Sequence, residues 1–167
     1  MKTLYIFRHA KSSWDNPNLA DFERPLNERG KKTMPLMGKV MIKSNFQPEL
    51  ILSSPAVRAK ETADLLKISA NLDVEVRLDE RIYEASPQSL IEVVSGLNES
   101  AKSAMLVGHN PGLEGLIKLL TGEIQAMPTA GLAVIDFDTE NWQEVTSETG
   151  RLRTVIRPKE EIRQQKQ

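Results

Sequence analysis

Short apolar runs alternate along the chain with longer stretches that have the spacing of amphipathic helices. This alternation predicts an α/β fold, a three-layer sandwich in which a mostly parallel central sheet carries helices on both faces. The apolar runs are short enough to be buried strands. The predicted strands are Leu4–Phe7, Leu50–Ser53, Val74–Val76, Ala104–Val107 and Leu132–Asp136.

The first predicted helix begins in the segment Pro25-Leu-Asn-Glu-Arg-Gly30. Asn27 is a plausible N-cap, and Glu28 is a favourable first-turn residue because its charge complements the positive end of a helix. Asp21, just upstream, is expected to act as another cap. Pro35 lies inside the predicted helix and lacks an amide hydrogen, so we expect it to kink or shorten the helix.

Two further helices are predicted to start in the same way, each directly after a strand. Ser54-Pro55 and Asn110-Pro111 both combine a capping residue with a proline at the first helical position, where the missing amide hydrogen costs nothing. The helix after Pro111 is expected to stop at Gly122, since glycine is favoured just past a helix end. Two strand-cap-proline-helix units support the parallel sheet.

The last ten residues differ from the rest of the chain. Residues 158–167 contain one aliphatic side chain and many charges, so they cannot bury enough apolar surface to offset the entropy of ordering. We expect a disordered tail or a frayed helix there. The remaining length suits one domain over residues 1–157, with no internal repeat or linker.

Composition excludes several classes of function. The chain has no cysteine, which excludes thiolate catalysis, disulfides and cysteine metal sites. Its net charge of −1 offers no overall field for nucleic acid or anionic lipid, so neither is an expected partner. Arg8 interrupts the N-terminal apolar stretch too early for a signal peptide or membrane span. We therefore expect a cytoplasmic protein, and a monomer.

Chemically versatile side chains follow three of the predicted strands. The chain has only two histidines, and His9 follows the first strand, beside Arg8, while His109 follows the fourth. Arg58 lies in the first helical turn after the second strand, where its side chain leans back toward the strand ends. Because ligands bind at the carboxyl ends of parallel strands, these four residues are expected to meet at one edge.

Two guanidiniums, two imidazoles and a helix N-terminus suit a phosphoryl group better than a carboxylate or a metal ion. Arginine matches phosphate oxygens in bidentate pairs, and helix N-termini add oriented amides. The two arginines would repel a divalent cation, and no acidic cluster accompanies the histidines, so we expect no metal and no cofactor. Arg58 lies unfavourably near the positive end of its helix, which itself suggests an anionic partner.

Three motifs resemble the signatures of the histidine phosphatase superfamily, with its phosphoglycerate-mutase-like fold. They are Arg8-His9-Ala10, Ser53-Ser54-Pro55-x-x-Arg58-Ala-x-x-Thr62-Ala63 and Val107-Gly108-His109-Asn110. The longer strings 8–14 and 24–30 resemble the SixA-type phosphohistidine phosphatase branch. The likeness extends from the first strand to about Ile156.

The resemblance implies that His9 is a nucleophile that becomes phosphorylated, while Arg8, Arg58 and His109 hold the phosphoryl group. The residues themselves agree, since two nearby arginines disfavour the imidazolium and keep His9 neutral. Ser12 is a further candidate for binding phosphate. Asn110 is another, although a capping role suits it better.

The resemblance also marks Leu78–Tyr83 as the segment that carries the acidic proton donor in related mutases. Glu80 is then the candidate general acid and Glu84 the reserve. A phosphohistidine substrate needs neither, because its leaving group is an imidazole whose pKa is near neutrality. A sugar phosphate releases an alkoxide and depends on an acid.

Three functions therefore remain open. The resemblance implies a phosphatase acting on phosphohistidine in a partner protein, through an intermediate on His9. A small-molecule phosphomonoesterase with the same chemistry is the alternative, and a small phosphorylated compound is then the partner. A phospho-binding module without catalysis is the third, which the complete set of arginines and histidines disfavours.

Overall fold

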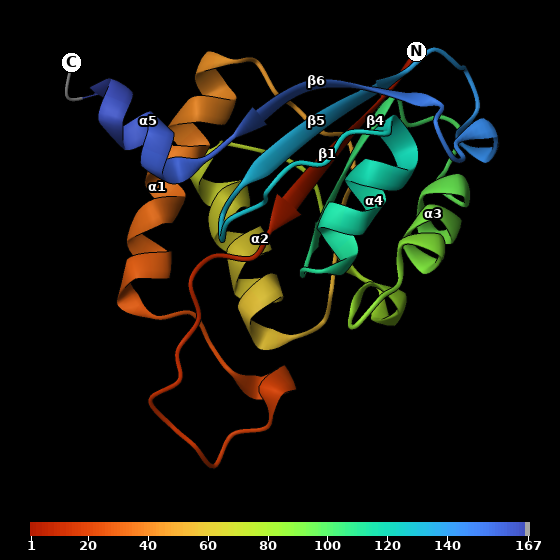
Figure 1. Cartoon of the computed structure of the whole chain (residues 1–167). Helices are drawn as coiled ribbons and strands as arrows, with labels where there is room; N and C mark the ends of the chain where they lie inside the picture. The colour runs from red at the N-terminus through yellow and green to blue at the C-terminus, as the bar shows by residue number, and fades with distance from the viewer. Residues whose placement is uncertain (166–167) are drawn as a thin grey trace.

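Within the described part of the chain, six strands form one sheet, and helices cover both of its faces (Figure 1). The computed structural model describes residues 1–165. The spatial order of the strands is β3-β2-β4-β1-β5-β6; the first four run parallel, while β5 and β6 are antiparallel to their neighbours. The predicted α/β three-layer fold is confirmed. The strands are β1 Lys2–Arg8, β2 Ile51–Ser53, β3 Val76–Leu78, β4 Ser103–Gly108, β5 Leu132–Phe137 and β6 Gly150–Ile156.

The long helices of the described residues divide between the two faces. Helices α1 and α2 pack on one face and α3 and α4 on the other, while α5 contacts α1 (Figure 1). The sequence did not predict α3 or the edge strand β6, and the third strand begins two residues later than expected. The bounds are α1 Glu28–Lys43, α2 Val57–Ser69, α3 Pro87–Ser95, α4 Gly112–Thr121 and α5 Pro158–Gln165.

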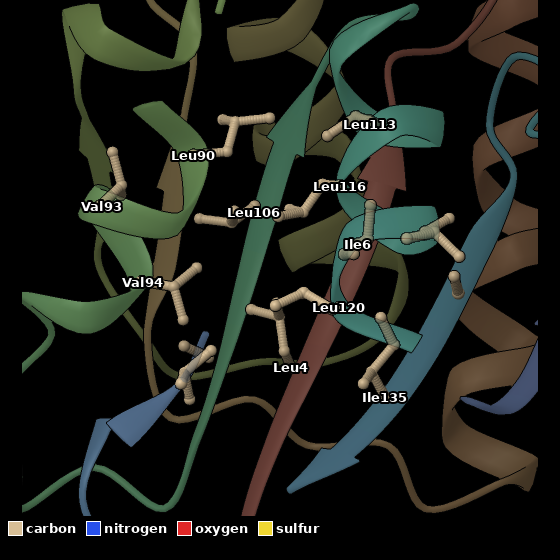
Figure 2. Close-up of a cluster of buried hydrophobic side chains, with 14 of the residues drawn as sticks. Leu4, Ile6, Leu90, Val93, Val94, Leu106, Leu113, Leu116, Leu120 and Ile135 are labelled. Carbon is tan, nitrogen blue, oxygen red and sulfur yellow. The ribbon is translucent and has the colours of Figure 1, made fainter. Parts of the chain in front are cut away.

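Alternation along the central strands builds two separate hydrophobic cores. In β1, Leu4 and Ile6 face α3 and α4, whereas Tyr5 and Phe7 face α1 and α2. Figure 2 shows the first of these clusters, where Leu106 of β4 lies among leucines of α3 and α4. Because side chains of a strand point alternately to opposite faces, one buried strand supports both helical layers. The histidines that follow β1 and β4 are thus fixed by packing from both sides.

Helix α1 begins as predicted but passes through its proline. The Asn27 side chain accepts a hydrogen bond from the Gly30 amide, which confirms the N-cap. The helix continues past Pro35 because Met34, Met37 and Met41 are fully buried on one face. Burying each methionine contributes about 1.5–3 kcal/mol, which together outweighs the roughly 3 kcal/mol cost of one proline.

The second predicted cap is wrong and the third is correct in part. Helix α2 begins at Val57, with Ala56 rather than Ser54 in the capping position, and the Ser54 hydroxyl contacts the Ala56 amide and His109 Nε2. Helix α4 begins at Gly112, and Asn110 Oδ1 accepts a hydrogen bond of 3.3 Å from the Glu114 amide. The predicted stop at Gly122 is confirmed, since this glycine ends α4 with a φ of 79°.

The segment after β6 is helical where the sequence predicted a disordered tail or a frayed helix. Pro158 begins α5 and is buried, and Arg157 tethers the turn before it by donating to the Ala126 carbonyl at 3.1 Å. Residues 166 and 167 of the expected tail lie outside the described residues. Over residues 1–165, the longest apolar helical stretches are too short to cross a bilayer.

Candidate active site

The register of the sheet brings the two histidines together at the carboxyl edge of β1 and β4. Arg8 is paired with Gly108 across these parallel strands, and the His9 amide donates to the Gly108 carbonyl at 3.0 Å. Each histidine directly follows the last residue of its strand. Their ring centroids lie 5.1 Å apart, and His9 is only 7% exposed.

Arg58 reaches the same edge from the first turn of α2. Its side chain is buried at 6% exposure, and its Nη1 and Nη2 donate to the backbone oxygen and the Oδ2 atom of Asp21 at 2.7 and 3.0 Å. Asp21 thus supplies the anion that an arginine at a positive helix end requires. The charge of Arg58 also acts on both imidazoles.

His9 is neutral, and its hydrogen bond determines which nitrogen is free. Burial, with the charges of Arg58, Arg8 and Arg24, lowers the pKa of His9 to about 4. Its Nδ1 lies 2.7 Å from the Ala10 carbonyl oxygen, which can only accept. Nδ1 therefore carries the proton and donates. The Nε2 atom keeps its lone pair, which is the requirement for a nucleophile.

His109 is also neutral and presents the opposite nitrogen. Burial and the neighbouring His9 and Arg58 lower the pKa of His109 to about 3. Its Nε2 lies 2.7 Å from Ser54 Oγ, and this hydroxyl also accepts the Ala56 amide at 3.2 Å. Within residues 1–165, this ring nitrogen is the one acceptor in reach of the hydroxyl's own hydrogen, so we assign that hydrogen to the Ser54–Nε2 bond and the ring hydrogen of His109 to Nδ1.

Three buried donors at this edge lack any hydrogen-bond partner within the described residues. They are Arg8 Nε, Arg58 Nε and His109 Nδ1. Buried polar groups are almost always paired, and leaving each one unpaired costs about 1–3 kcal/mol. Three such donors from three elements beside a neutral imidazole have the chemistry of a site for a phosphoryl oxyanion.

Arg8 is held in place through the loop that precedes β5. Its Nη1 donates to the Met127 carbonyl at 3.0 Å, and the Asn110 side chain donates to the same oxygen at 2.9 Å. The Met127 amide in turn donates to Glu114 Oε1. The structure therefore places Asn110 among the residues that fix Arg8, with its amide nitrogen occupied by protein acceptors.

Ser12, a predicted phosphate ligand, lies under Arg24. Its Oγ accepts from Arg24 Nη1 at 2.8 Å, and the Arg24 guanidinium stacks 3.5 Å from the ring centre of the exposed Trp14. Gly30 of α1 allows the helix to approach the same loop closely, because a Cβ at this position would lie 2.2 Å from the Lys11 carbonyl oxygen. The loop after His9 is therefore pressed against the start of α1.

The proposed general acids lie outside this cluster of contacts. Glu80 and Glu84 are exposed, and neither side chain makes a hydrogen bond or ion pair within residues 1–165. From the same segment, Tyr83 reaches the site, with its ring 5.5 Å from the His109 ring and edge-on to it. Its hydroxyl donates to Asp21 Oδ2 at 2.7 Å.

Asp21 is the site residue that the sequence misassigned as a cap. Its carboxylate binds Arg58, Arg24 and Tyr83. These donors outweigh its partial burial and lower the pKa of Asp21 to about 2. It is an anion at neutral pH and holds both terminal nitrogens of Arg58, which leaves Nε for another acceptor. Within residues 1–165, no group of three metal-ligating side chains is present.

We expect Asp21→Ala to lower kcat/KM by about tenfold or more, because charged hydrogen bonds that orient Arg58 are lost. Asp21→Asn should retain part of the activity, since its amide oxygen still accepts. Tyr83→Phe is the matched control, which removes one hydrogen bond to Asp21 and leaves its charge. Steady-state kinetics with one phosphorylated substrate measure all three. A rise in activity in Asp21→Ala would instead mean that Asp21 blocks the site.

The pKa values predict that neither histidine titrates between pH 5.5 and 8. The chain has two histidines, so their ring proton signals can be followed by NMR, with a His109→Gln variant to assign them. His9 should titrate near 4 and His109 near 3. The unfolded chain takes up protons from about pH 6.5 downward, so stability should fall as pH drops toward 4. A midpoint near 6.5 for either ring would contradict the buried neutral site.

The sequence matches the profile of a known protein family. The sequence profile of the Histidine phosphatase superfamily (branch 1) matches residues 4–90, a range that includes Arg8, His9 and Arg58 but not His109. A protein of Agrobacterium tumefaciens, provisionally named phosphohistidine phosphatase SixA, is 29% identical. Its crystal structure aligns over 94% of this chain and 98% of its own, with a TM-score of 0.81.

Two further solved structures share the fold at lower identity. The protein histidine phosphatase SixA complexed with tungstate is 22% identical, with a TM-score of 0.83 over 95% of this chain and 98% of its own. A mycobacterial glucosyl-3-phosphoglycerate phosphatase is 19% identical, with a TM-score of 0.64 over 92% and 97%. The profile match over more than half of the sequence shows that the chain belongs to branch 1 of the histidine phosphatase superfamily.

Proposed function

We propose that this chain is a phosphatase that removes the phosphoryl group from phosphohistidine in a partner protein, through a phosphorylated His9. One observation carries the proposal. A neutral imidazole with a free Nε2 lies beside three buried, unpaired donors of Arg8, Arg58 and His109. Such donors stabilise the charge that develops on the equatorial oxygens during phosphoryl transfer.

In the first step, Nε2 of His9 forms a bond to phosphorus as the phosphorus–nitrogen bond of the substrate breaks. The substrate ring takes a proton from solvent on its far nitrogen, so it leaves as neutral imidazole. The phosphorylated His9 still carries the hydrogen on Nδ1, where the Ala10 carbonyl accepts it. This hydrogen keeps the ring cationic and therefore a good leaving group.

In the second step, water attacks the phosphorus and the bond to His9 Nε2 breaks. Inorganic phosphate is released, and the excess proton passes to solvent. His9 returns to the neutral form with its hydrogen on Nδ1, so the cycle closes without a proton donor at the scissile bond. Arg8, Arg58 and His109 serve both steps, because the transferred group occupies the same place in each.

The carboxylates around the site support an imidazole leaving group over an alkoxide. Asp21 touches Arg58, but a pKa of about 2 keeps it ionised and unable to donate a proton at neutral pH. Glu80 and Glu84 are exposed. An alkoxide leaving group requires a donor with a higher pKa in reach of the scissile oxygen. Glu80 remains the proposed acid only for the alternative below.

Similarity to the Agrobacterium tumefaciens protein supports the same choice, since its provisional name is phosphohistidine phosphatase SixA. A small-molecule phosphomonoesterase is the second candidate. The observation that favours it is the fold shared with a glucosyl-3-phosphoglycerate phosphatase. A phospho-binding module without catalysis is a weaker candidate, because the neutral His9 and its donors form a complete set for transfer.

The test compares a histidine-phosphorylated phosphotransfer protein with glucose 6-phosphate, 3-phosphoglycerate and p-nitrophenyl phosphate at equal enzyme concentration. We expect kcat/KM to be highest for the phosphohistidine protein. Phosphoenzyme trapped by rapid mixing should be acid-labile and base-stable, as phosphohistidine is. A higher kcat/KM for a sugar phosphate would instead identify the chain as a small-molecule phosphomonoesterase. Glu80→Gln should then lower that activity and leave phosphohistidine hydrolysis unchanged.

A further inference from the structure

A second concave site lies at the same edge of the sheet, between the first turns of α1 and α5. This cavity of about 580 Å³ is lined by Lys11 of the loop after β1, by the loop 126–130 that leads into β5, and by the start of α5 after β6. The first turn of α1 closes it with Arg29. Its volume is in the range of small-molecule sites, and neither His9 nor Arg58 lines it.

The lining is strongly basic in a chain whose net charge is −1. Five cationic side chains face two acidic ones, and both carboxylates are engaged. Glu114 accepts from the Met127 amide, and Glu160 lies 3.8 Å from Arg157 Nη1. The remaining cations, which form no ion pair within residues 1–165, are Lys11, Arg29, Lys159 and Arg163.

Apolar side chains interrupt the basic lining. Ile162 of α5, which is 42% exposed, lines the cavity together with Pro128 and Ala126. The guanidiniums of Arg29 and Arg163 offer planar surfaces as well as forked donors, so they suit both phosphate oxygens and the face of a flat ring. A ligand that satisfies this lining has an anionic group and a flat, weakly polar body.

We propose that this cavity is a binding site for a small phosphorylated molecule with a flat ring, of the mononucleotide class. The cationic lining disfavours a metal ion, and the overall charge offers no support for a long nucleic acid. The concave shape favours a compact ligand over the flat face of a partner protein. The proposal rests on the cavity alone and holds whatever substrate His9 serves.

The cavity wall is bonded to the catalytic strand. The Met127 carbonyl accepts from Arg8 Nη1 at 3.0 Å, and the Ala130 amide lies 3.0 and 3.1 Å from the backbone oxygens of Arg8 and His9. A ligand that presses on residues 127–130 therefore acts on the position of Arg8. We expect occupancy of the cavity to change the rate of phosphoryl transfer at His9.

The test titrates the four ribonucleoside 5′-monophosphates into a His9→Ala variant by isothermal calorimetry, so that the probe is not consumed. We expect at least one nucleotide to bind more tightly than its nucleoside or inorganic phosphate. The double variant Arg29→Glu/Arg163→Glu, in the same background, should weaken that binding by about tenfold or more. Lys39→Glu/Lys43→Glu, an equal charge reversal elsewhere on α1, is the matched control and should change it less than twofold.

Adding Arg58→Ala separates the two sites, because it removes a donor at the histidines and should leave nucleotide binding unchanged. Thermal melting of every variant checks the fold, and Arg29→Gln/Arg163→Gln gives a milder test if the charge reversal unfolds α5. Three results would each overturn the proposal. They are loss of binding on Arg58→Ala with no effect of the cavity variants, binding of a polyglutamate peptide but no nucleotide, and no measurable binding of any nucleotide.

Discussion

Replacing His9 with alanine is expected to lower turnover by roughly 10⁴-fold or more, because the attacking atom itself is removed. The Nδ1 bond to Ala10 leaves the Nε2 of this ring free, whereas the Nε2 of the neighbouring His109 is engaged by Ser54 Oγ. Phosphate release from a phosphohistidine protein, measured under saturating enzyme, reports the effect. Trapped phosphoenzyme should disappear in the same variant.

His109→Ala provides the contrast, because it keeps the nucleophile and removes one donor. This variant should still form phosphoenzyme, at a rate about 10²-fold lower. The centroids of the two rings lie only 5.1 Å apart. A different effect of the two substitutions would therefore separate the role of the nucleophile from that of the donor. Turnover of His9→Ala within tenfold of the original chain would end the mechanism, whatever its substrate.

Replacing Arg58 with alanine is the second large effect, an expected loss of about 10²-fold or more in kcat. The Nε atom of this buried side chain is one of the three unpaired donors, while its terminal nitrogens are fixed by Asp21. Arg58→Lys should recover little, because an ammonium cannot bind Asp21 and present a second donor in the same geometry. Single-turnover kinetics separate the loss in transfer from any change in substrate binding.

Lys60→Ala is the matched control for Arg58, since it removes an exposed cation two residues along the same helix. We expect it to change kcat less than twofold. An equal loss in Lys60→Ala would mean that general attraction by positive charge explains the effect. Retention of full kcat in Arg58→Ala would mean that Arg58 does not bind the phosphoryl group during transfer.

The meeting of these residues at one edge of the sheet could be predicted, because the end of a strand is visible in the sequence as the end of a short apolar run. Arg8 and His9 directly follow one apolar run and His109 follows another, and parallel strands present those ends at one edge. The parallel pairing of Arg8 with Gly108 brings the rings together. The sequence also indicated, from the position of Arg58 at a positive helix end, that an anion would be nearby.

The sequence analysis assigned that anion to a bound phosphoryl group; the contact of Arg58 with Asp21 could not be predicted, because it joins distant residues. Asp21 lies 37 residues from Arg58 along the chain, in a polar segment where capping was the simplest interpretation. Ser54 was assigned as a cap for the same reason, yet its hydroxyl bonds His109 at a separation of 55 residues. Local patterns describe a residue's own element and not the partner that folding brings to it.

The missed elements have a related cause. In β6, Arg151 and Arg153 alternate with partly buried residues, which is a weak signal for an edge strand. The strand is stabilised across the sheet, where Arg153 Nε donates to Asp136 Oδ2 at 2.8 Å. Helix α5, where a disordered tail or a frayed helix was expected, has little apolar surface of its own, and its start is held by the bond from Arg157 to the Ala126 carbonyl.

His9 and Asp21 come from parts of the chain that differ in how readily they accept substitutions. His9 extends from β1, an interior strand whose Leu4, Ile6 and Phe7 are fully buried, whereas Asp21 comes from an exposed connection between β1 and α1. Surface connections tolerate exchange far better than buried strands do. Substitutions in this one connection could therefore change the substrate specificity of relatives, while the attacking imidazole and the strands that support it stay the same.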